Sequence, residues 1–522
     1  MTELRPHTTA ALAPPPEEGS ALVHGPLAHW AQQCGDSVAL QNECEAWTFA
    51  QLHAEVLCRS AALVARQAPA MLLLEAQQST LQRLINFLAV IHSGRCAAMA
   101  DPDWPEAVRQ HIASWLPTEP CDLQHATPGS PFYTGFTSGS TGLPKGFMRH
   151  HRSWTESFRV GLQDFGAVAA QRTLSPGRIS HSLFLFGALQ GLWYGTGAIV
   201  QEKFSAARCL NTLASGDAPC LLAVPSQLLL LLQWAEHRKL APIPQVELIT
   251  ISGARWMRDH TPALKALFPR ARIIEFYGAS ELSFVAWMDA EEAAQGASPR
   301  AVGRPFSNVD IEIRPITPPA SQSPDAGQCT HPAGAQDGLI YIRSPMLFMD
   351  YVGQTQDQAA VLRDGPWLSV RDIGHIDAQG RLCLTGRQSR MLVTQGKNLF
   401  PEEVENLLLS HPQIAQVSLH GQDDALRGMQ VHAVVQWHQA QSQHPPLPSS
   451  LELSSWVRER LEAFKAPRHW WVSDAWPQTT SGKTDHARLG QALTLALADK
   501  PVPAGPGLAS PLSLPRLQAW RS

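Results

Sequence analysis

The chain has 522 residues, which is more than one compact core usually holds, so we expect two or more domains. Hydrophobic residues make up 44% of the sequence and charged residues only 16%, with a formal net charge of −4. This composition excludes a chain that is disordered throughout, and it argues against a protein that a basic surface holds on nucleic acid.

The nine cysteines are scattered, without a CxxC pair or a Cys/His ladder. That pattern indicates reduced thiols rather than a disulfide framework or a zinc site. The first twenty residues have no apolar core of signal-peptide length, and the most apolar run, at 221–232, is too short to span a bilayer. We therefore expect a cytoplasmic protein with no membrane span and no nucleic-acid partner.

From about residue 20 to residue 385, short apolar runs alternate with longer amphipathic stretches. Alternation of this kind predicts an α/β fold in which helices cover both faces of a parallel or mixed sheet. Such sheets bind ligands at the carboxyl ends of their strands, where the loops gather. Strands are expected at 71–75, 96–100, 220–224, 247–252 and 273–277, and helices at 81–93 and 258–267.

Changes in composition divide the chain into four predicted parts. A stretch at 316–337 that is rich in Pro, Ser, Ala and Gln is predicted to be a surface loop. Near the C-terminus, residues 514–520 are expected to dock locally. The four parts are a flexible N-terminus at 1–24, a large domain of sheets covered by helices at 25–386, a small mobile α+β domain at 387–500, and a Pro-rich tail at 501–522.

The strongest local signal is the segment from Tyr133 to Gly146, with the sequence YTGFTSGSTGLPKG. Its glycines let the backbone turn closely and point N–H groups inward, its hydroxyls add donors, and its lysine supplies a cation. A polyphosphate needs that combination. The segment is not a Walker A loop, because Leu143 and Pro144 separate the last glycine from the lysine. Phosphate contacts are therefore predicted for Thr137, Ser138, Gly139, Ser140, Thr141, Gly142 and Lys145.

The motif FTSGSTGLPKG resembles the phosphate loop of the adenylate-forming superfamily, to which acyl-CoA synthetases, luciferases and adenylation domains belong. Companion motifs follow in the family's order over roughly residues 25 to 490. The segment EFYGASE at 275–281 resembles the family's YGxTE, which implies that Tyr277 stacks on adenine and that Glu281 holds Mg²⁺ beside the phosphates. SGA at 252–254 resembles the loop that closes the adenine pocket. The implied nucleotide site therefore also includes Gly253, Ala254, Gly278 and Ser280.

Downstream motifs of the family are present too. VRDIG at 370–374 stands where the family has TGD, and the resemblance implies that Asp372 accepts hydrogen bonds from both ribose hydroxyls. Arg387 is implied to contact ribose or phosphate. PQTTSGK at 477–483 resembles the family's PxTxSGK, whose lysine, here Lys483, reaches both the attacking carboxylate and the α-phosphate. A cation at that point stabilises the charge that develops during an in-line displacement.

The chain has only eight lysines, and two of them, Lys145 and Lys483, stand at motif positions. A third, Lys465, either matches another family position or is an ordinary surface lysine. Pro401, in a segment that resembles the family's GxxxxPxEVE, is well placed to start a helix. The alternative interpretations are a turn residue for Asp372 and a solvated turn residue for Lys483.

The resemblance implies an AMP-forming acid–thiol ligase that works in two half-reactions. A carboxylate attacks the α-phosphate of Mg·ATP, which releases pyrophosphate and leaves an acyl-adenylate. The small domain then rotates, and the thiol of coenzyme A attacks the carbonyl and releases AMP. ATP, Mg²⁺ and coenzyme A are thus implied. The implied catalytic residues are Lys483, Glu281 and His181, and core packing is the alternative for His181.

Two positions depart from the family and leave the second half-reaction open. Ser389 stands at the hinge position, where Asp or Lys is usual, and Val393 stands where several members have a lysine. Alternatives are therefore an acyl carrier protein as the acceptor, or a paralogue that binds nucleotide and is catalytically impaired. Nothing in the motifs favours an oxygenase like the luciferases.

The sequence restricts the acid only coarsely. The apolar stretch SHSLFLFGALQGL at 180–192 has no carboxylate to pair with an ammonium group, so we expect an aliphatic or aryl acid rather than an amino acid. Phe276 stands where the family often has a small residue beside the acyl pocket, and Trp256 is close to the adenine loop. Both indicate a short or narrow pocket.

Overall fold

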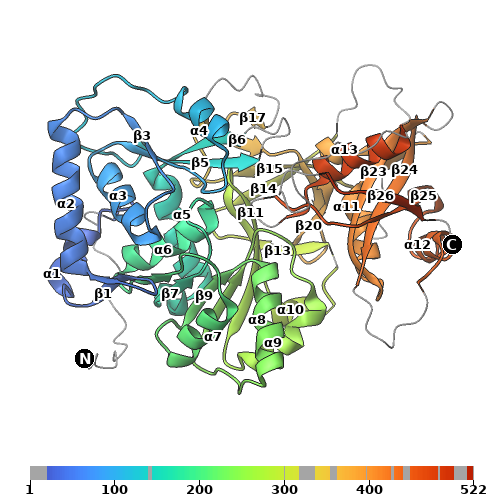
Figure 1. Cartoon of the computed structure of the whole chain (residues 1–522), viewed down its shortest axis with the longest axis horizontal. Helices are drawn as coiled ribbons and strands as arrows, with labels where there is room; N and C mark the ends of the chain where they lie inside the picture. The colour runs from blue at the N-terminus through green and yellow to red at the C-terminus, as the bar shows by residue number, and fades with distance from the viewer. Residues whose placement is uncertain are drawn as a thin grey trace. The chain divides into compact units, whose positions relative to one another are not determined.

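The chain forms two compact units. The large unit comprises Met1–Ile311 and Ile342–Leu368, and the small unit comprises Glu312–Tyr341 and Ser369–Ser522. In the described part of the chain, no helix is both long enough and apolar enough to cross a membrane. The computed structural model describes residues 20–138, 144–294, 296–298, 300–316, 336–352, 361–395, 397–424, 428–438, 447–479, 483–498 and 514–520 (Figure 1).

The larger sheet of the large unit is mixed. It consists of β1 (Val38–Gln41), β2 (Ala46–Thr48), β7 (Thr173–Ser175), β8 (Ala198–Val200), β9 (Cys220–Ala223), β10 (Leu248–Ile251), β11 (Arg272–Ala279), β12 (Ser283–Asp289) and β13 (Ala301–Pro305). Their order is β13-β12-β11-β10-β9-β7-β8-β1-β2. The strands from β7 to β11 pair parallel with one another, and β12 pairs antiparallel with both its neighbours. A parallel or mixed sheet is what the sequence predicts.

A second sheet of the large unit carries the predicted phosphate loop. It consists of β3 (Met71–Leu74), β4 (Cys96–Met99), β5 (Pro131–Ser138), β6 (Pro144–His150) and β16 (Asp350–Val352), in the order β16-β6-β5-β4-β3. Strands β3, β4 and β5 pair parallel with one another, whereas β6 pairs antiparallel with both β5 and β16. The pairing of β16 with β6 brings a segment from far along the chain next to the phosphate loop.

Helices cover both faces of the larger sheet. Ala223 and Ile249 belong to the apolar core beneath α7 (Ala206–Ser215), α8 (Pro225–Arg238) and α9 (Thr261–Leu267), which Figure 1 draws in green. Leu222 and Thr250 instead face α5 (His151–Phe165) and α6 (Ser182–Tyr194), because successive side chains of a strand point to opposite faces. The other helices of this unit are α1 (Leu27–Gln33), α2 (Phe49–Ala65), α3 (Thr80–His92), α4 (Glu106–Ala113), α10 (Ala290–Ala294) and the 3₁₀ turns η1 (Ala167–Ala170) and η2 (Arg258–His260).

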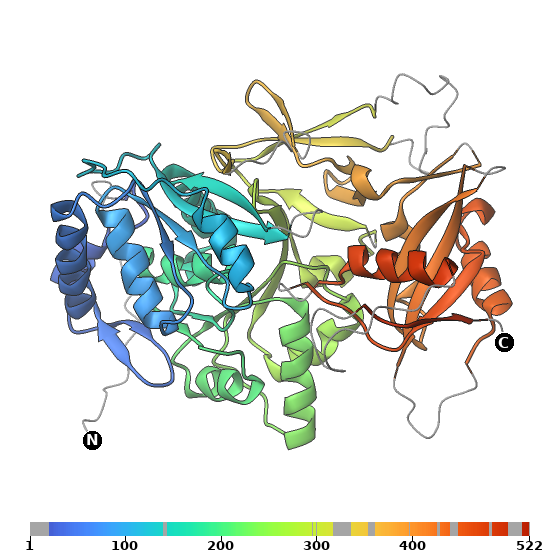
Figure 2. The ribbon, with the colours of Figure 1, turned by 45° about the horizontal axis from the view of Figure 1, so that its top comes forward.

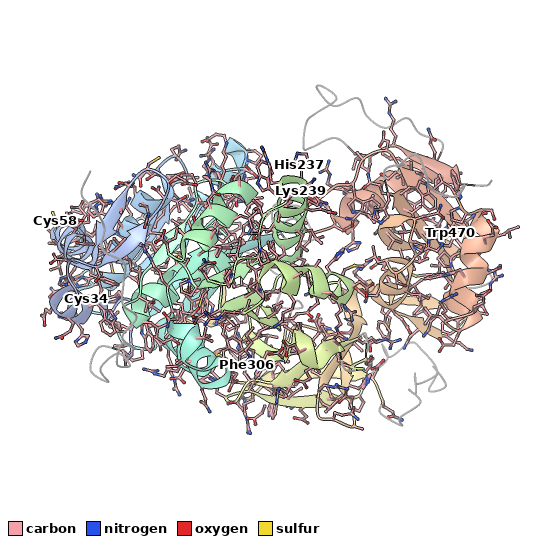
Figure 3. All side chains as sticks on the ribbon, turned by 90° about the horizontal axis from the view of Figure 1, so that it is seen from below. Cys34, Cys58, His237, Lys239, Phe306 and Trp470 are labelled. Atoms are coloured by element: carbon pink, nitrogen blue, oxygen red, sulfur yellow. The ribbon has the colours of Figure 1, made fainter. Side chains whose placement is uncertain are left out.

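The small unit is an α+β layer. Its main sheet has the order β22-β21-β24-β25-β26, with β23 also paired to β24. Helices α11 and α12 pack on it around the buried Trp470, which Figure 3 labels. In Figure 2, α13 lies beside these strands. The elements are η4 (Gln388–Arg390), β21 (Leu392–Thr394), β22 (Lys397–Leu399), α11 (Pro401–Leu408), β23 (Ile414–Asp424), β24 (Gly428–Trp437), α12 (Ser450–Arg458), η5 (Ala463–Lys465), β25 (His469–Ser473), α13 (His486–Leu497) and β26 (Leu517–Trp520).

A smaller group of strands precedes that layer in the small unit. It contains β19 (Asp372–Ile376) and β20 (Leu382–Arg387), which pair antiparallel. Gly338 and Leu339 of β15 (Gly338–Arg343) pair with the other edge of β19. Three further strands lie close to points at which the chain passes from one unit to the other. They are β14 (Asp310–Arg314), β17 (Leu362–Asp364) and β18 (Trp367–Ser369).

The expected elements are present with small shifts of their ends. Each of the five predicted strands corresponds to an observed one, and the predicted helix at 81–93 is α3. The helix predicted for 258–267 divides into a 3₁₀ turn and α9, because a proline ring fits only the first turn of an α-helix and Pro262 therefore sets its start. Pro401 begins α11 as predicted, and β26 docks on β25.

Candidate active site

The predicted phosphate loop joins β5 to β6 as a hairpin. Thr137 lies opposite Lys145, and Ser138 lies opposite Pro144. The described ends of the loop therefore place Thr137 and Lys145 side by side. The remaining predicted contacts, Gly139, Ser140, Thr141 and Gly142 together with the side chain of Ser138, lie outside the described residues.

A tight turn at the carboxyl end of β11 carries Ser280 and Glu281. A Cβ atom at Gly278, which precedes this turn, would lie 2.0 Å from the carbonyl oxygen of Ser283. Ser283 has a φ of 61°, in the left-handed region that L-residues rarely adopt. The backbone of the turn is therefore closely constrained, and it holds Ser280 and Glu281 in one place.

Tyr351 connects the phosphate hairpin to the turn with Glu281. The Lys145 ammonium lies 4.9 Å from the centroid of the Tyr351 ring. The Tyr351 hydroxyl donates to Glu281 Oε1 at 2.8 Å. The N–H of Phe348 also donates to the Glu281 carbonyl oxygen at 2.8 Å. The sequence analysis did not identify Tyr351 as a site residue, because its place beside Lys145 depends on the pairing of β16 with β6.

The predicted adenine loop follows β10. Gly253 and Ala254 are exposed, and Gly253 has a φ of 86°, which favours glycine. Ser252 Oγ donates to the carbonyl oxygen of Phe276 at 3.0 Å and so fastens the loop to β11, one residue before the half-buried Tyr277. The two segments that the resemblance assigned to adenine are therefore neighbours.

A buried carboxylate also anchors this loop. Glu275 Oε1 accepts a hydrogen bond from the N–H of Trp256 at 2.9 Å. Burial raises the pKa of Glu275, and the bond from Trp256 opposes that rise. The indole N–H of Trp256 donates to Thr261 Oγ1 at 2.9 Å, and its ring packs in the core beneath α7–α9. The prediction that Trp256 narrows the acyl pocket is wrong, because its ring lies on the other face of the sheet from α5 and α6.

His181 occupies the N-cap of α6 and is half-buried. The loop that leads to it is fixed by a buried acid, since Ser180 Oγ donates to Asp101 Oδ2 at 2.7 Å. Arg178 lies 3.6 Å from the other oxygen of Asp101. Because Asp101 follows β4 and His181 follows β7, both lie beyond the carboxyl ends of strands, where the fold gathers its binding loops.

A small apolar cavity lies between the larger sheet and the layer of α5 and α6. Its volume is about 20 Å³, close to what a single buried water needs. Four buried rings line it, from Phe165 of α5, Phe186 of α6, Phe276 of β11 and Phe284 of β12. The ring centroid of Phe284 is 4.8 Å from that of Phe276 and 5.2 Å from that of Phe186. Aromatic side chains therefore fill most of the space beside α6.

In the small unit, Asp372 and Arg387 form an ion pair. They face each other across β19 and β20, with Arg387 Nε donating to Asp372 Oδ1 at 2.8 Å. The Asp372 side chain is 6% exposed and that of Arg387 is 57% exposed. The pair therefore combines a carboxylate that is held rigidly with a cation that remains accessible.

Lys483 lies on a short turn before α13 and is exposed. The Thr479 N–H donates to the Lys483 carbonyl oxygen at 2.7 Å, and the Lys483 N–H donates to Thr479 Oγ1 at 3.2 Å. Next to it, the Trp476 indole donates to Thr484 Oγ1 at 3.1 Å. The backbone of Lys483 is thus fixed, and the residue is exposed.

Lys465 is not an ordinary surface lysine. Its Nζ lies 2.8 Å from a carboxylate oxygen of Glu403 and 2.8 Å from one of Glu462. The side chains of Lys465 and Glu403 are only 6% and 5% exposed. Burial acts to lower the pKa of Lys465, but the two carboxylates outweigh it and raise the pKa. The ammonium group therefore ties α11 to η5.

Comparison with known proteins identifies two matching family models. One, described as AMP-binding enzyme, matches residues 113–352, and the other, described as AMP-binding enzyme C-terminal domain, matches residues 403–483. An uncharacterized acyl–CoA ligase of Bacillus subtilis, YhfT, is 35% identical over 363 residues, which are 69% of this chain and 68% of that protein. The 2-succinylbenzoate–CoA ligase of the same organism is 26% identical over 67% of this chain and 66% of that protein.

Solved structures share the fold. O-succinylbenzoate coenzyme A synthetase from Bacillus subtilis, in complex with AMP, aligns with a TM-score of 0.71 at 21% identity, over 88% of this chain and 96% of that one. The amide bond synthetase McbA from Marinactinospora thermotolerans aligns with a TM-score of 0.70 at 23% identity, over 89% of this chain and 99% of that one.

Proposed function

The chain belongs to the adenylate-forming superfamily of AMP-binding enzymes and is an AMP-forming ligase of the acyl-CoA synthetase type, and from this premise we propose that it joins a compact aliphatic or aryl acid to coenzyme A. The observation that carries the proposal is the contact chain from Lys145 through Tyr351 to Glu281. It sets a cation and a carboxylate beside a loop whose composition suits a polyphosphate.

The reaction proceeds in two displacements. An oxygen of the acid attacks the α-phosphorus of ATP, the bond to the β-phosphate oxygen breaks, and pyrophosphate leaves. The thiolate of coenzyme A then attacks the carbonyl carbon of the acyl-adenylate, and AMP leaves as the thioester forms. Both steps place charge on phosphate oxygens, so oriented N–H groups and cations accelerate them.

The large unit supplies the nucleotide contacts in this proposal. Lys145 and the hairpin around Thr137 bind the phosphates, and Tyr277 stacks on adenine beside the Gly253 loop. The bond from Ser252 to the carbonyl oxygen of Phe276 supports the adenine contacts, because it holds the Gly253 loop beside Tyr277. The pairing of Thr137 with Lys145 supports the phosphate contacts. The proposed nucleotide contacts are completed, through backbone or hydroxyl groups, by Gly139, Ser140, Thr141, Gly142, Ala254, Gly278 and Ser280.

The donor set fits a magnesium ion that arrives with the nucleotide. In the described part of the chain, there is no group of three or more His, Cys, Asp and Glu side chains that can hold a metal ion. A single carboxylate such as Glu281 suits Mg²⁺, which usually keeps water and takes its other ligands from substrate phosphates. When bound, the ion neutralises charge on the phosphates during the displacement.

The small unit supplies the remaining polar groups in this proposal. Asp372 accepts from the ribose hydroxyls, and the exposed Arg387 contacts ribose or phosphate. Lys483 stabilises the charge that develops as the acid attacks the α-phosphorus. Support comes from the fixed backbone and exposed side chain of Lys483, which suit a group that must reach a substrate.

The size of the acid follows from the space beside α6. His181 orients the carboxylate, and the acyl group extends along α6 toward Phe276. Pockets for drug-sized ligands have volumes of about 300–1,000 Å³. The cavity lined by Phe186, Phe276 and Phe284 is far smaller, about 20 Å³. Because this cavity holds no more than one water, any acyl group that enters it has to displace rings. We propose a compact acid of a few carbons or one ring, because a long chain has to displace more of them.

A mass-spectrometric end-point assay tests the reaction and its acceptor. Purified protein and Mg·ATP are incubated near neutral pH with a panel of short aliphatic and aryl acids. The acceptor is either coenzyme A or a phosphopantetheinylated carrier protein. The proposal predicts acyl-CoA and AMP in equal amounts for at least one acid. An acyl-adenylate that accumulates with coenzyme A but is transferred to the carrier protein would contradict coenzyme A as the acceptor.

A further inference from the structure

A buried arginine joins three segments of the candidate active site in the large unit. Arg149, near the end of β6, is 1% exposed. Its Nη1 donates to the carbonyl oxygen of Ser280 at 2.7 Å. Its Nη2 donates to the hydroxyl of Ser283 and to the carbonyl oxygen of Met346 at 2.5 Å. Its Nε donates to Ser153 Oγ at 3.2 Å, at the start of α5.

Three of these four acceptors, Ser280, Ser283 and Met346, belong to segments around Glu281. Ser280 and Ser283 lie on either side of Glu281, in the turn between β11 and β12. Met346 precedes the segment in which the Phe348 N–H donates to the Glu281 carbonyl and the Tyr351 hydroxyl donates to Glu281 Oε1. One guanidinium thus holds the turn from two sides and fixes the segment that engages Glu281.

The electrostatics of Arg149 are unusual for a structural arginine. All four of its hydrogen bonds go to uncharged oxygens, although burying a charge is unfavourable unless it is compensated. Burial lowers the pKa of Arg149 to about 9, and the negative charge of Glu281 counteracts that fall. The arginine therefore remains a cation at neutral pH whose favourable partner is the Glu281 carboxylate.

Only a planar fork of donors reaches these acceptors together. An ammonium group has its three donors on one atom, so it cannot bond the Ser280 carbonyl from one nitrogen and the Ser283 hydroxyl and Met346 carbonyl from another. The requirement is thus for arginine, and not merely for a positive charge.

We propose that Arg149 is a positioning residue for acid activation, which fixes the backbone around Glu281 so that this carboxylate meets the metal–nucleotide complex in one orientation. This inference rests on the proposed function, since Glu281 is assigned to the metal ion there. It adds a residue that touches neither substrate nor metal and acts through the Glu281 turn.

Hydrogen exchange of the metal-free protein tests the positioning directly. Arg149→Met and Arg149→Lys are expected to accelerate exchange at the amides of Leu282 and Phe348, whose acceptors are the carbonyl oxygens of Ala279 and Glu281. Ser283→Ala removes one acceptor and is expected to give a smaller acceleration at the same amides in a folded protein. Arg152→Met, an exposed arginine at the start of α5, is the matched control and is expected to change nothing there.

Calorimetric titration with Mg·ATP and with AMP, the latter in EDTA, separates positioning from general damage. For both Arg149 variants we expect Mg·ATP to bind roughly 10- to 100-fold more weakly, as for other groups that orient a metal ligand. AMP affinity is expected to change by less than about threefold, because AMP in EDTA makes no contact through a metal ion and, of its proposed contacts, only Ser280 is bonded to Arg149. Unchanged exchange at the two amides, or an equal loss of AMP and Mg·ATP binding, would overturn the inference.

The proposed function fails in a different way. Wild-type protein that binds neither Mg·ATP nor AMP would contradict the nucleotide site itself. The exchange experiment would then still decide whether Arg149 fixes the Glu281 turn.

Discussion

Gly278 shows how closely the turn before Glu281 is packed. In Gly278→Ala, the new Cβ meets the Ser283 carbonyl oxygen at 2.0 Å, and backbone cannot move aside as a flexible side chain can. We expect a loss of about 1–3 kcal/mol in the free energy of unfolding and a larger loss of adenylation than of AMP binding. Gly129→Ala is the matched control, because its Cβ would have no neighbour within 4 Å. Equal stability of both variants in urea unfolding would contradict this geometry.

Phe276 tests the size of the acid. Phe276→Ala removes a ring from the cavity beside α6, and we expect the ratio of kcat/KM for a six- to eight-carbon acid over a shorter one to rise roughly tenfold or more. The ratio cancels any loss of folded enzyme. Phe268→Ala, a buried phenylalanine in the core beneath α7–α9, is the control and should leave the ratio unchanged. A similar shift in both variants would mean that Phe276 does not limit the acyl group.

Residue types that chemistry prescribes were predictable at this scale, and contacts between distant segments were not. Lys145 was predicted because a polyphosphate needs a cation, whereas Glu281 and Lys483 were implied by the family resemblance, and all three roles stay predictions. Arg149 and Tyr351 gave no such signal. An arginine in a short strand looks like any partly exposed residue until the chain between Ser344 and Val352 is known to return beside β6.

At the scale of elements, a pH-sensitive pair joins His375 of β19 to Asp337, the residue before β15. His375 Nδ1 lies 2.8 Å from Asp337 Oδ1, which also accepts from Thr385 Oγ1 at 2.9 Å. The bond to Asp337 is the largest cause that raises the pKa of His375 to about 9, followed by one to Cys383. The folded pKa is higher than the unfolded value of about 6.5, so the pair stabilises fully below pH ~6.5. That stability is lost as the pH rises through about 9.

Urea unfolding between pH 6.5 and 10 measures this effect. Wild type is expected to lose on the order of 2–3 kcal/mol over this range relative to His375→Gln. His237→Gln, an exposed histidine at the end of α8 that Figure 3 labels, should follow wild type. Parallel pH curves for wild type and His375→Gln would show that the pair contributes no pH-dependent stability.

The elements themselves were largely readable from hydrophobic runs, whereas their ends and their pairing were not. Buried strands such as β9 and β10 are short, mostly apolar runs, so their composition and length reveal them. Pro262 moved the start of α9, and the face of the sheet on which Trp256 lies depended on tertiary packing. Strands that are neighbours in a sheet are often far apart in the sequence, and no local signal predicted their order.

For the whole molecule, the predicted family, the α/β fold and the ligase activity are confirmed by the family models and the relatives. The structure divides the chain between Leu368 and Ser369, whereas the motifs favoured a boundary at 386/387, which stays a prediction. The predicted N-terminus at 1–24 and tail at 501–522 lie mostly outside the described residues. Because Ser389 and Val393 depart from the family's pattern, the acceptor of the acyl group has to be identified by experiment.

Acid-dependent exchange of labelled pyrophosphate into ATP tests the central claim most directly, because it reports formation of the acyl-adenylate without regard to the acceptor. With an acid that the panel identifies, the wild-type protein should exchange pyrophosphate into ATP. Lys483→Ala should lower the exchange rate by about 100-fold or more and leave the thermal unfolding of the protein unchanged. Lys203→Ala, an exposed lysine, should match wild type. Exchange by Lys483→Ala at a rate close to that of wild type would contradict the account.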